Sequence, residues 1–130
     1  MLKLENVSKF YYNKGIIASG FTKVNLELKI GEFVVITGES GSGKSTLLNV
    51  ISGLDSYEEG EMYANGNETS HFSEKDFEDY RRKYVANIFQ TFNLVNSYTV
   101  YQNIELVLLL NGYKKRKVKK RARKASLLGV

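Results

Sequence analysis

The 130-residue sequence contains no cysteine and no proline, a single histidine, and no apolar run longer than five residues. Without cysteine the chain has no disulfide framework, no thiol nucleophile and no thiolate metal site. The longest apolar run, residues 106–110, is far shorter than the roughly 20 residues that cross a bilayer. No charged segment followed by an apolar one opens the chain, so no secretory signal is indicated. These absences agree with a cytoplasmic protein.

Acidic side chains are missing from one segment, and this absence divides the chain by charge. Residues 114–124 hold nine of the 19 Lys and Arg and no acid, whereas the rest has ten basic and 14 acidic residues. The net charge of +5 is therefore the sum of an acidic domain and one basic segment. With 42% apolar and 25% charged residues, the composition is that of a soluble globular domain.

A glycine-rich segment fits the phosphate-binding pattern G-x-x-x-x-G-K-[ST]. Its residues are Gly38, Glu39, Ser40, Gly41, Ser42, Gly43, Lys44, Ser45 and Thr46. An apolar run precedes it at residues 33–36, and an apolar helical pattern follows it at residues 47–51. This strand, loop and helix order is the context in which the motif, called the P-loop, binds phosphate.

Each residue type in the loop has a chemical reason. The glycines allow the backbone to approach a phosphate chain closely, so that successive N–H groups point inward at the positive end of the next helix. Lys44 is expected to reach the β- and γ-phosphates, and the Ser45 hydroxyl to ligate Mg²⁺. Thr46 is expected to contact the α-phosphate. The alternative is a turn rich in Gly and Ser before a helix.

Two hydrophobic patterns predict two kinds of strand. Residues 1–7 and 24–30 alternate apolar and polar side chains, which indicates an antiparallel sheet with one wet face. A loop is expected between them over residues 13–20. The continuous apolar runs at 33–36 and 84–90 predict parallel strands buried on both faces. Together with the P-loop, these patterns predict an α/β fold.

A further short strand and four helices are expected after the antiparallel segments. The strand covers residues 60–66 and closes on an Asn-Gly turn. The helices are marked by recognisable ends: from the P-loop to Gly53, from Ser73 with Asp76, from Thr99 to Asn111-Gly112, and a basic helix ending at Leu128-Gly129.

These segments together resemble the N-terminal half of an ATP-binding cassette (ABC) transporter ATPase, over essentially all 130 positions. The resemblance implies a P-loop NTPase core with an N-terminal antiparallel β-subdomain. Residues 1–90 match the β-subdomain and part of the core, and residues 91–130 match the start of the helical subdomain. The forms F-Q-x-F-N-L at 89–94 and T-V-x-x-N at 99–103 are most similar to lipoprotein-release, macrolide-export and antimicrobial-peptide-resistance cassettes.

The resemblance implies ATP and Mg²⁺ as ligands and adds two site residues. Gln90 matches the glutamine of the Q-loop, which in the family contacts Mg²⁺ or the attacking water; an amide offers both an acceptor and donors for this. Tyr11 matches the A-loop aromatic that stacks on adenine, although Phe10 and Tyr12 adjoin it. The alternatives are a strand-end polar role for Gln90 and core packing for Tyr11. Lys44 and Gln90 are thus the expected catalytic positions.

The resemblance also implies partners and a location. Family members work with a transmembrane permease and as a head-to-tail pair of ATPases, on the cytoplasmic face of the cell membrane. No nucleic-acid partner is expected.

The sequence also departs from the family pattern. A signature motif, a Walker B strand with its catalytic Glu, and a switch His cannot be found, and His71 lies in a polar stretch typical of a solvated loop. Hydrolysis needs a group that orients or deprotonates water. The chain is therefore expected to be a truncated cassette that binds nucleotide without turning it over, although the complete protein would be an ATPase.

Two other functions remain open from the sequence. The basic segment 114–124 could neutralise phosphates of a nucleic acid or lie against anionic lipid, although it is expected to be a solvated helix face. A small P-loop kinase carries a similar loop. Such a kinase normally places the loop within its first few residues, whereas here two strand-like segments come first.

Overall fold

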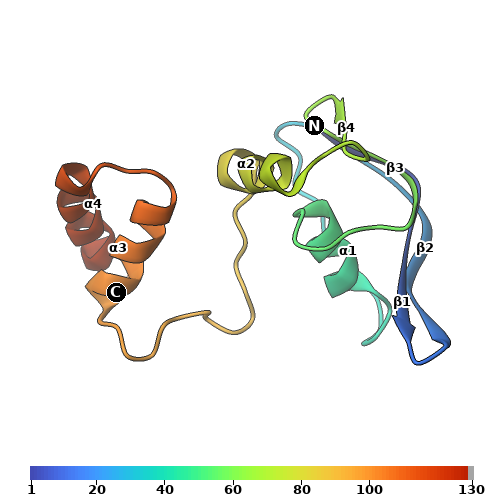
Figure 1. Ribbon diagram of the computed structural model, residues 1–130, viewed down its shortest axis with the longest axis horizontal. Helices are drawn as coiled ribbons and strands as arrows, with labels where there is room; N and C mark the ends of the chain where they lie inside the picture. Colours follow the sequence, from blue (N-terminus) through green and yellow to red (C-terminus); the bar gives the residue numbers. More distant parts are fainter. Residues whose placement is uncertain (129–130) are drawn as a thin grey trace. The chain divides into compact units, whose positions relative to one another are not determined.

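The computed structural model describes residues 1–128, which form two compact units that divide between Ala86 and Asn87. The first unit contains β1 (Leu2–Asn13), β2 (Ile16–Leu28), α1 (Lys44–Ile51), β3 (Glu59–Ala64), β4 (Asn67–Glu68) and α2 (Glu74–Tyr84). The second contains α3 (Val100–Leu110) and α4 (Lys115–Leu128) (Figure 1). The predicted end of the basic helix at Gly129 lies outside the described residues.

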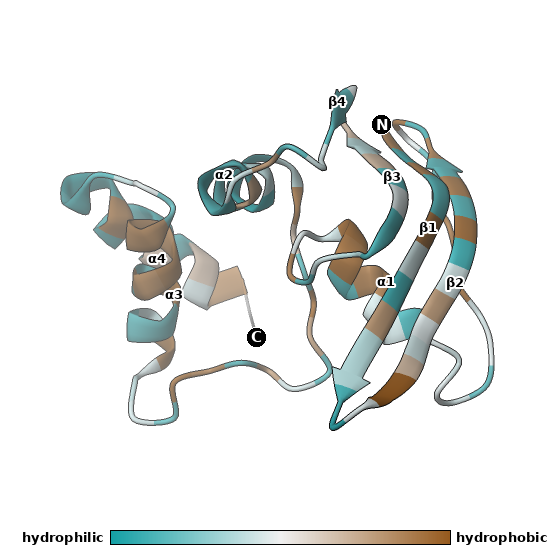
Figure 2. Cartoon of the chain, turned by 45° about the vertical axis from the view of Figure 1, so that its right-hand side comes forward, coloured by the Kyte–Doolittle hydropathy of each residue, from teal (hydrophilic) through white to brown (hydrophobic). Residues whose placement is uncertain are grey.

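The first unit is built on one antiparallel sheet with the strand order β2-β1-β3-β4. Leu4 of β1 stands opposite Leu26 of β2 on one side and Met62 of β3 on the other. Apolar and polar residues alternate along β1 and β2, as Figure 2 shows by colour. The sheet therefore presents one apolar face, as the alternation predicts.

The apolar face of the sheet packs against α1 to make the core. Its buried members come from β1, β2, α1 and β3: Leu4, Val7, Phe21, Leu47, Val50 and Met62. Full burial of such a side chain stabilises a fold by about 1.5–3 kcal/mol. This packing fixes the helix that follows the P-loop onto the sheet.

Two tight turns connect the strands, and only one of them was predicted. Asn65 and Gly66, both with positive φ, form the expected turn between β3 and β4. The loop predicted over residues 13–20 is wrong, because Lys14 and Gly15 also take positive φ and β2 begins at Ile16. Ile16 and Ile17 are adjacent apolar residues, and both are exposed, at 71% and 63%. Apolar and polar residues therefore do not alternate in this part of β2, and the sequence does not predict a strand there.

The parallel strands predicted over residues 33–36 and 84–90 are not formed. A strand is stabilised by backbone hydrogen bonds to a neighbour, and within residues 1–128 no ladder joins either segment to another strand. Phe33 is accordingly 93% exposed. Apolar composition alone therefore overestimates the number of strands.

The helix α2 starts with the predicted cap. The Ser73 side chain accepts a hydrogen bond from the Asp76 backbone N–H at 3.3 Å, and the Ser73 backbone N–H donates to Asp76 Oδ2 at 2.8 Å. Hydrogen bonds from Ser73 lower the pKa of Asp76. This capping box satisfies two donors that the first turn otherwise leaves unpaired.

We expect Ser73→Ala to lower the free energy of unfolding by about 1 kcal/mol, because the helix loses its N-cap acceptor. Urea unfolding followed by circular dichroism measures the change. Ser70→Ala, at an exposed serine three residues earlier, is the control and should stay within about 0.5 kcal/mol of the original chain. Equal losses for both variants would contradict the capping role.

The second unit pairs α3 with α4. The helix α3 starts directly after Thr99, as the sequence predicts, and Thr99 and Gln102 form a capping box there. Val118 and Ala122, one helical turn apart, are buried where α4 packs on α3. No helix among residues 1–128 is long and apolar enough to cross a membrane.

Candidate phosphate-binding site

The P-loop leads into α1, which begins at Lys44. Gly43 is the N-cap residue and has φ of 89°. A Cβ atom at this position would lie 2.0 Å from the backbone oxygen of Gly20 in β2. Only glycine fits, because the left-handed conformation and the close approach both exclude a side chain. The sheet thus holds the start of α1 by direct backbone contact.

The Lys44 ammonium lies within the P-loop. Nζ donates to the carbonyl oxygens of Gly38 at 2.9 Å and Glu39 at 2.5 Å, and to Ser42 Oγ at 3.2 Å. These contacts place one positive charge over the loop backbone. Hydrogen bonds to an anionic oxygen are stronger than bonds to a carbonyl, so a phosphate competes well for this ammonium.

The first turn of α1 is suited to an anion. Within residues 1–128 no side chain caps this N-terminus, and its first turn contains no acidic residue. The early N–H groups of a helix have no partner inside the helix and carry the positive end of its dipole. Ser45 in this turn is exposed. The loop, the Lys44 ammonium and the helix end together form a phosphate-binding arrangement.

The donor set also fits Mg²⁺ held jointly with phosphates. Among residues 1–128 no group of three His, Asp or Glu side chains is placed to hold a metal ion. Mg²⁺ is usually bound by one or two protein ligands together with substrate phosphates and water. A single hydroxyl from Ser45 beside bound phosphates matches that pattern.

The structure brings Tyr11 next to the P-loop helix. Its hydroxyl lies 3.2 Å from Asp55 Oδ2 and 3.5 Å from Thr46 Oγ1, in the first turn of α1. Tyr11 is 41% exposed. Tyr12 is more exposed, and within residues 1–128 it makes no hydrogen bond to α1. Tyr11 therefore lies beside the predicted phosphate site.

Gln90 belongs to the other compact unit of the chain. It is exposed in a bend of that unit, whereas the P-loop and Tyr11 belong to the first. Its role therefore remains a prediction. The His71 side chain is 87% exposed and lies 3.5 Å from Glu68, an arrangement typical of a solvated loop.

A buried lysine near Tyr11 was missed by the sequence analysis. Lys9 Nζ contacts Asp55 Oδ1 at 3.0 Å, Glu58 Oε1 at 3.2 Å and Ser56 Oγ at 3.3 Å, and its side chain is only 6% exposed. These partners are 46 to 49 residues away, so no local pattern could reveal them. Asp55 lies within the part of the sequence that resembles an ABC transporter ATPase, but no sequence pattern around it predicts a lysine partner.

The two charges at the centre of this cluster shift each other's pKa. Burial lowers the pKa of Lys9, but the hydrogen bonds and charges of Asp55 and Glu58 outweigh burial, so the pKa is raised. Burial likewise raises the pKa of Asp55, but Lys9, the Ser56 backbone N–H and the Tyr11 hydroxyl lower it further than burial raises it. Both groups are therefore held in their charged forms at neutral pH.

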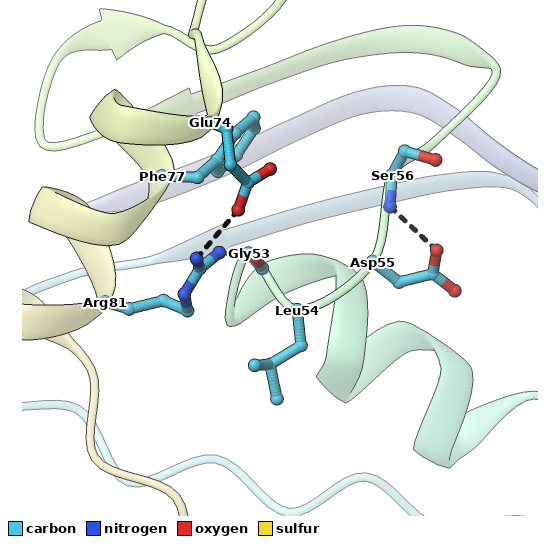
Figure 3. Close-up of a pocket in the computed structure, with 7 residues that line it drawn as sticks. All are labelled: Gly53, Leu54, Asp55, Ser56, Glu74, Phe77 and Arg81. Carbon is cyan, nitrogen blue, oxygen red and sulfur yellow. Dashed lines mark hydrogen bonds and ion pairs between the residues drawn. The ribbon is translucent and has the colours of Figure 1, made fainter.

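Asp55 also lines a pocket of about 350 Å³ (Figure 3). Arg81 of α2 lines it and donates to the backbone oxygen of Gly53 and to Glu74 Oε1, the latter at 3.0 Å. Tyr80 donates to the Ile51 backbone oxygen at 2.7 Å, and burial raises the pKa of its hydroxyl. These contacts tie α2 to the end of α1 and to the segment that follows it, and the pocket lies between α2 and residues 53–56.

The basic segment forms most of α4. Apart from Val118 and Ala122, the side chains of residues 114–124 are exposed. Arg121 lies 4.6 Å from the centre of the Tyr113 ring, a distance typical of a cation–π contact. An amphipathic helix with one buried stripe and a charged outer face has this distribution.

Comparison with known proteins identifies the family of the chain. The sequence profile described as "ABC transporter" matches residues 21–129. An uncharacterized ABC transporter ATP-binding protein of Methanocaldococcus jannaschii is 40% identical over 124 residues, which are 95% of this chain and 55% of that protein. The phosphonates import ATP-binding protein PhnC of Lactococcus lactis subsp. cremoris is 44% identical over 80% of this chain and 41% of its own length.

A solved structure gives the same answer for the fold. The ATP-binding cassette MJ0796, in a dimeric post-hydrolysis state with ADP and Pi, matches with a TM-score of 0.85 and 39% identity. The match covers 95% of this chain and 55% of the cassette, so the chain spans about half the length of its relatives. Its fold is that of an ABC ATPase, and the chain belongs to the ABC transporter ATP-binding family.

Proposed function

We propose that this chain is the nucleotide-binding part of an ABC transporter ATPase and that it binds ATP at residues 38–46. The observation that supports this most directly is the placement of the Lys44 ammonium inside the P-loop, at the uncapped start of α1. Tyr11 lies beside the same turn and is the proposed platform for adenine. Family membership favours this function over a small P-loop kinase.

Different residues are proposed to bind different parts of the nucleotide and its metal ion. Backbone N–H groups of residues 38–46 and the Lys44 ammonium hold the phosphates, and Thr46 contacts the α-phosphate. Ser45 and Gln90 are the proposed protein ligands for Mg²⁺, which neutralises charge on the phosphates when it is bound. Lys44 and Gln90 are the proposed catalytic positions of the complete ATPase.

The complete protein is proposed to couple ATP binding and hydrolysis to transport through a membrane permease, at the cytoplasmic face of the membrane. The dimer of the similar cassette MJ0796 supports pairing with a second copy. The relative named for phosphonates import supports work with a transport system. The forms of residues 89–94 and 99–103 favour export or extraction over import. Co-purification with a membrane permease, followed by assay of its cargo, tests that direction.

Lys44→Ala is expected to weaken ATP binding by about tenfold to a hundredfold, because one hydrogen-bonded charge on the phosphates contributes about 1.5–3 kcal/mol. Calorimetric titration of the 130-residue chain with ATP and Mg²⁺ measures the change. Lys29→Ala removes an equally long exposed lysine and is the matched control. Unchanged affinity in the Lys44 variant would contradict the proposed site.

The 130-residue chain is also proposed to bind ATP without multiple turnover, since a Walker B strand with its catalytic Glu cannot be found in its sequence. Phosphate release from the purified chain should stay at background. Turnover that disappears in the Lys44→Ala variant would contradict this proposal.

A further inference from the structure

Three side chains beside the P-loop helix form a closed set of contacts, here called the Tyr11 brace: Lys9, Tyr11 and Asp55. Lys9 Nζ lies 5.1 Å from the centre of the Tyr11 ring and 3.0 Å from Asp55 Oδ1. The other carboxylate oxygen, Asp55 Oδ2, lies 3.2 Å from the Tyr11 hydroxyl. The ring is thus held at its face by a cation and at its tip by a carboxylate.

We infer that Lys9 and Asp55 are positioning residues, which fix the Tyr11 ring at the angle and depth needed for a nucleotide base to stack on it. The inference rests on the proposed function, because it assigns a partner to the base of a nucleotide whose phosphates lie in the P-loop. Thr46 Oγ1, 3.5 Å from the Tyr11 hydroxyl, links the brace to the first turn of α1.

Lys9 is a rigid support for the ring. An ammonium has three donors, and here Asp55, Ser56 and Glu58 accept from it. Glu58 is fixed in turn, because the Phe10 backbone N–H donates to its Oε2 at 2.8 Å. A side chain this fully bonded and 6% exposed has lost its rotamer freedom. The ring against which it lies is therefore fixed before any ligand arrives, which reduces the entropic cost of stacking.

The brace leaves part of Tyr11 open to solvent. The Lys9 cation lies over one face of the ring, and the residue as a whole is 41% exposed. The exposed part is what a base can cover. Aromatic side chains stack readily on bases because every base has a π-face.

Gly20 of β2 sets how closely the ring approaches α1. A Cβ atom at this position would lie 3.1 Å from Tyr11 Cε2, 3.2 Å from Lys9 Cγ and 2.8 Å from Thr46 Cγ2. All three neighbours would have to move for any side chain to fit. Because residue 20 has no side chain, Tyr11, Lys9 and the P-loop helix can pack closely around it.

The brace also reduces an electrostatic conflict. Asp55 brings a negative charge to the tyrosine that adjoins an anion-binding loop, and like charges repel. Lys9 lies 3.0 Å from that carboxylate and offsets part of its charge, although Glu58 shares the same ammonium at 3.2 Å. Asp55 can therefore hold the hydroxyl with less repulsion of the phosphates than an unpaired carboxylate would cause.

The test compares ATP with inorganic tripolyphosphate, which carries the phosphates without a base. Calorimetric titrations of the 130-residue chain use the original sequence, Tyr11→Ala, Tyr11→Phe and Asp55→Asn. Stacking of a base on an aromatic ring contributes roughly fivefold to a hundredfold in affinity, so Tyr11→Ala should lose this factor for ATP alone. Tyr11→Phe removes the hydroxyl, and Asp55→Asn replaces its charged acceptor with a neutral one. Both variants keep the ring but weaken the hold on its tip, and should lose about threefold to tenfold for ATP alone.

The matched control is Tyr63→Phe, which removes another hydroxyl that contacts a carboxylate, that of Glu61. It should change neither affinity. If Asp55→Asn and Tyr11→Phe weaken both ligands equally, or neither, the positioning role is overturned. If the original chain binds neither ligand, or Lys44→Ala changes neither affinity, the proposed function itself fails. The two failures are thereby distinguished.

Discussion

Gly43→Ala is expected to lower the free energy of unfolding by on the order of 3 kcal/mol and to abolish measurable nucleotide binding. The left-handed conformation at φ 89° costs a residue with a Cβ about 1–2 kcal/mol. The new Cβ would also lie 2.0 Å from the Gly20 oxygen, so two backbone segments must separate. Such overpacking typically costs about 1–3 kcal/mol more. Because β2 and the start of α1 separate, the N–H groups of the P-loop lose their alignment.

Gly41→Ala is the matched control for stability. Gly41 has a similar φ of 81°, but no atom lies within 4 Å of the position of its Cβ. The free energy of unfolding of the Gly41→Ala variant should therefore fall only by the cost of the left-handed conformation, about 1–2 kcal/mol. Urea unfolding of the 130-residue chain, followed by circular dichroism, gives both values. Equal losses at the two positions would show that the close approach of Gly20 does not constrain the loop.

The P-loop could be predicted from the sequence because its information is local. The residues from Gly38 to Thr46 are contiguous, and each contributes a backbone group or a side chain to one turn. Helix caps were predicted for the same reason, since Ser73 reaches Asp76 only three residues away. Neighbours along the chain determine such features, so the order of residue types is enough to predict them.

The features that the sequence analysis missed depend on distant residues. Lys9 resembles any exposed lysine of a strand until Asp55 and Glu58 are placed beside it. Gly20 matters only because the P-loop helix lies against it. The same reasoning explains the error at residues 33–36, where an apolar run predicts burial but cannot supply the neighbouring strand.

Lys9→Met is expected to lower the free energy of unfolding by about 2–4 kcal/mol at about pH 7. The substitution keeps most of the buried stem and removes the ammonium, which leaves two carboxylates close together without their cation. The side chains of Asp55 and Glu58 remain 31% and 27% exposed, so water compensates part of the loss. Lys3→Met on the same strand removes a lysine from an exposed pair with Glu5. This control should change stability by less than about 0.5 kcal/mol.

The dependence of this loss on pH follows from the direction of each pKa shift. The pKa of Asp55 is lowered in the folded chain, so its contribution is complete above about pH 4 and is lost as the pH falls through the lowered value. The pKa of Lys9 is raised, so its contribution is complete below about pH 10 and is lost only as the pH rises through the raised value. Urea unfolding of both chains from about pH 8 down to about pH 3 should therefore show a constant difference that shrinks at the acid end. A difference that persists unchanged after Asp55 is protonated would mean that the ion pair between Lys9 and Asp55 does not account for the loss.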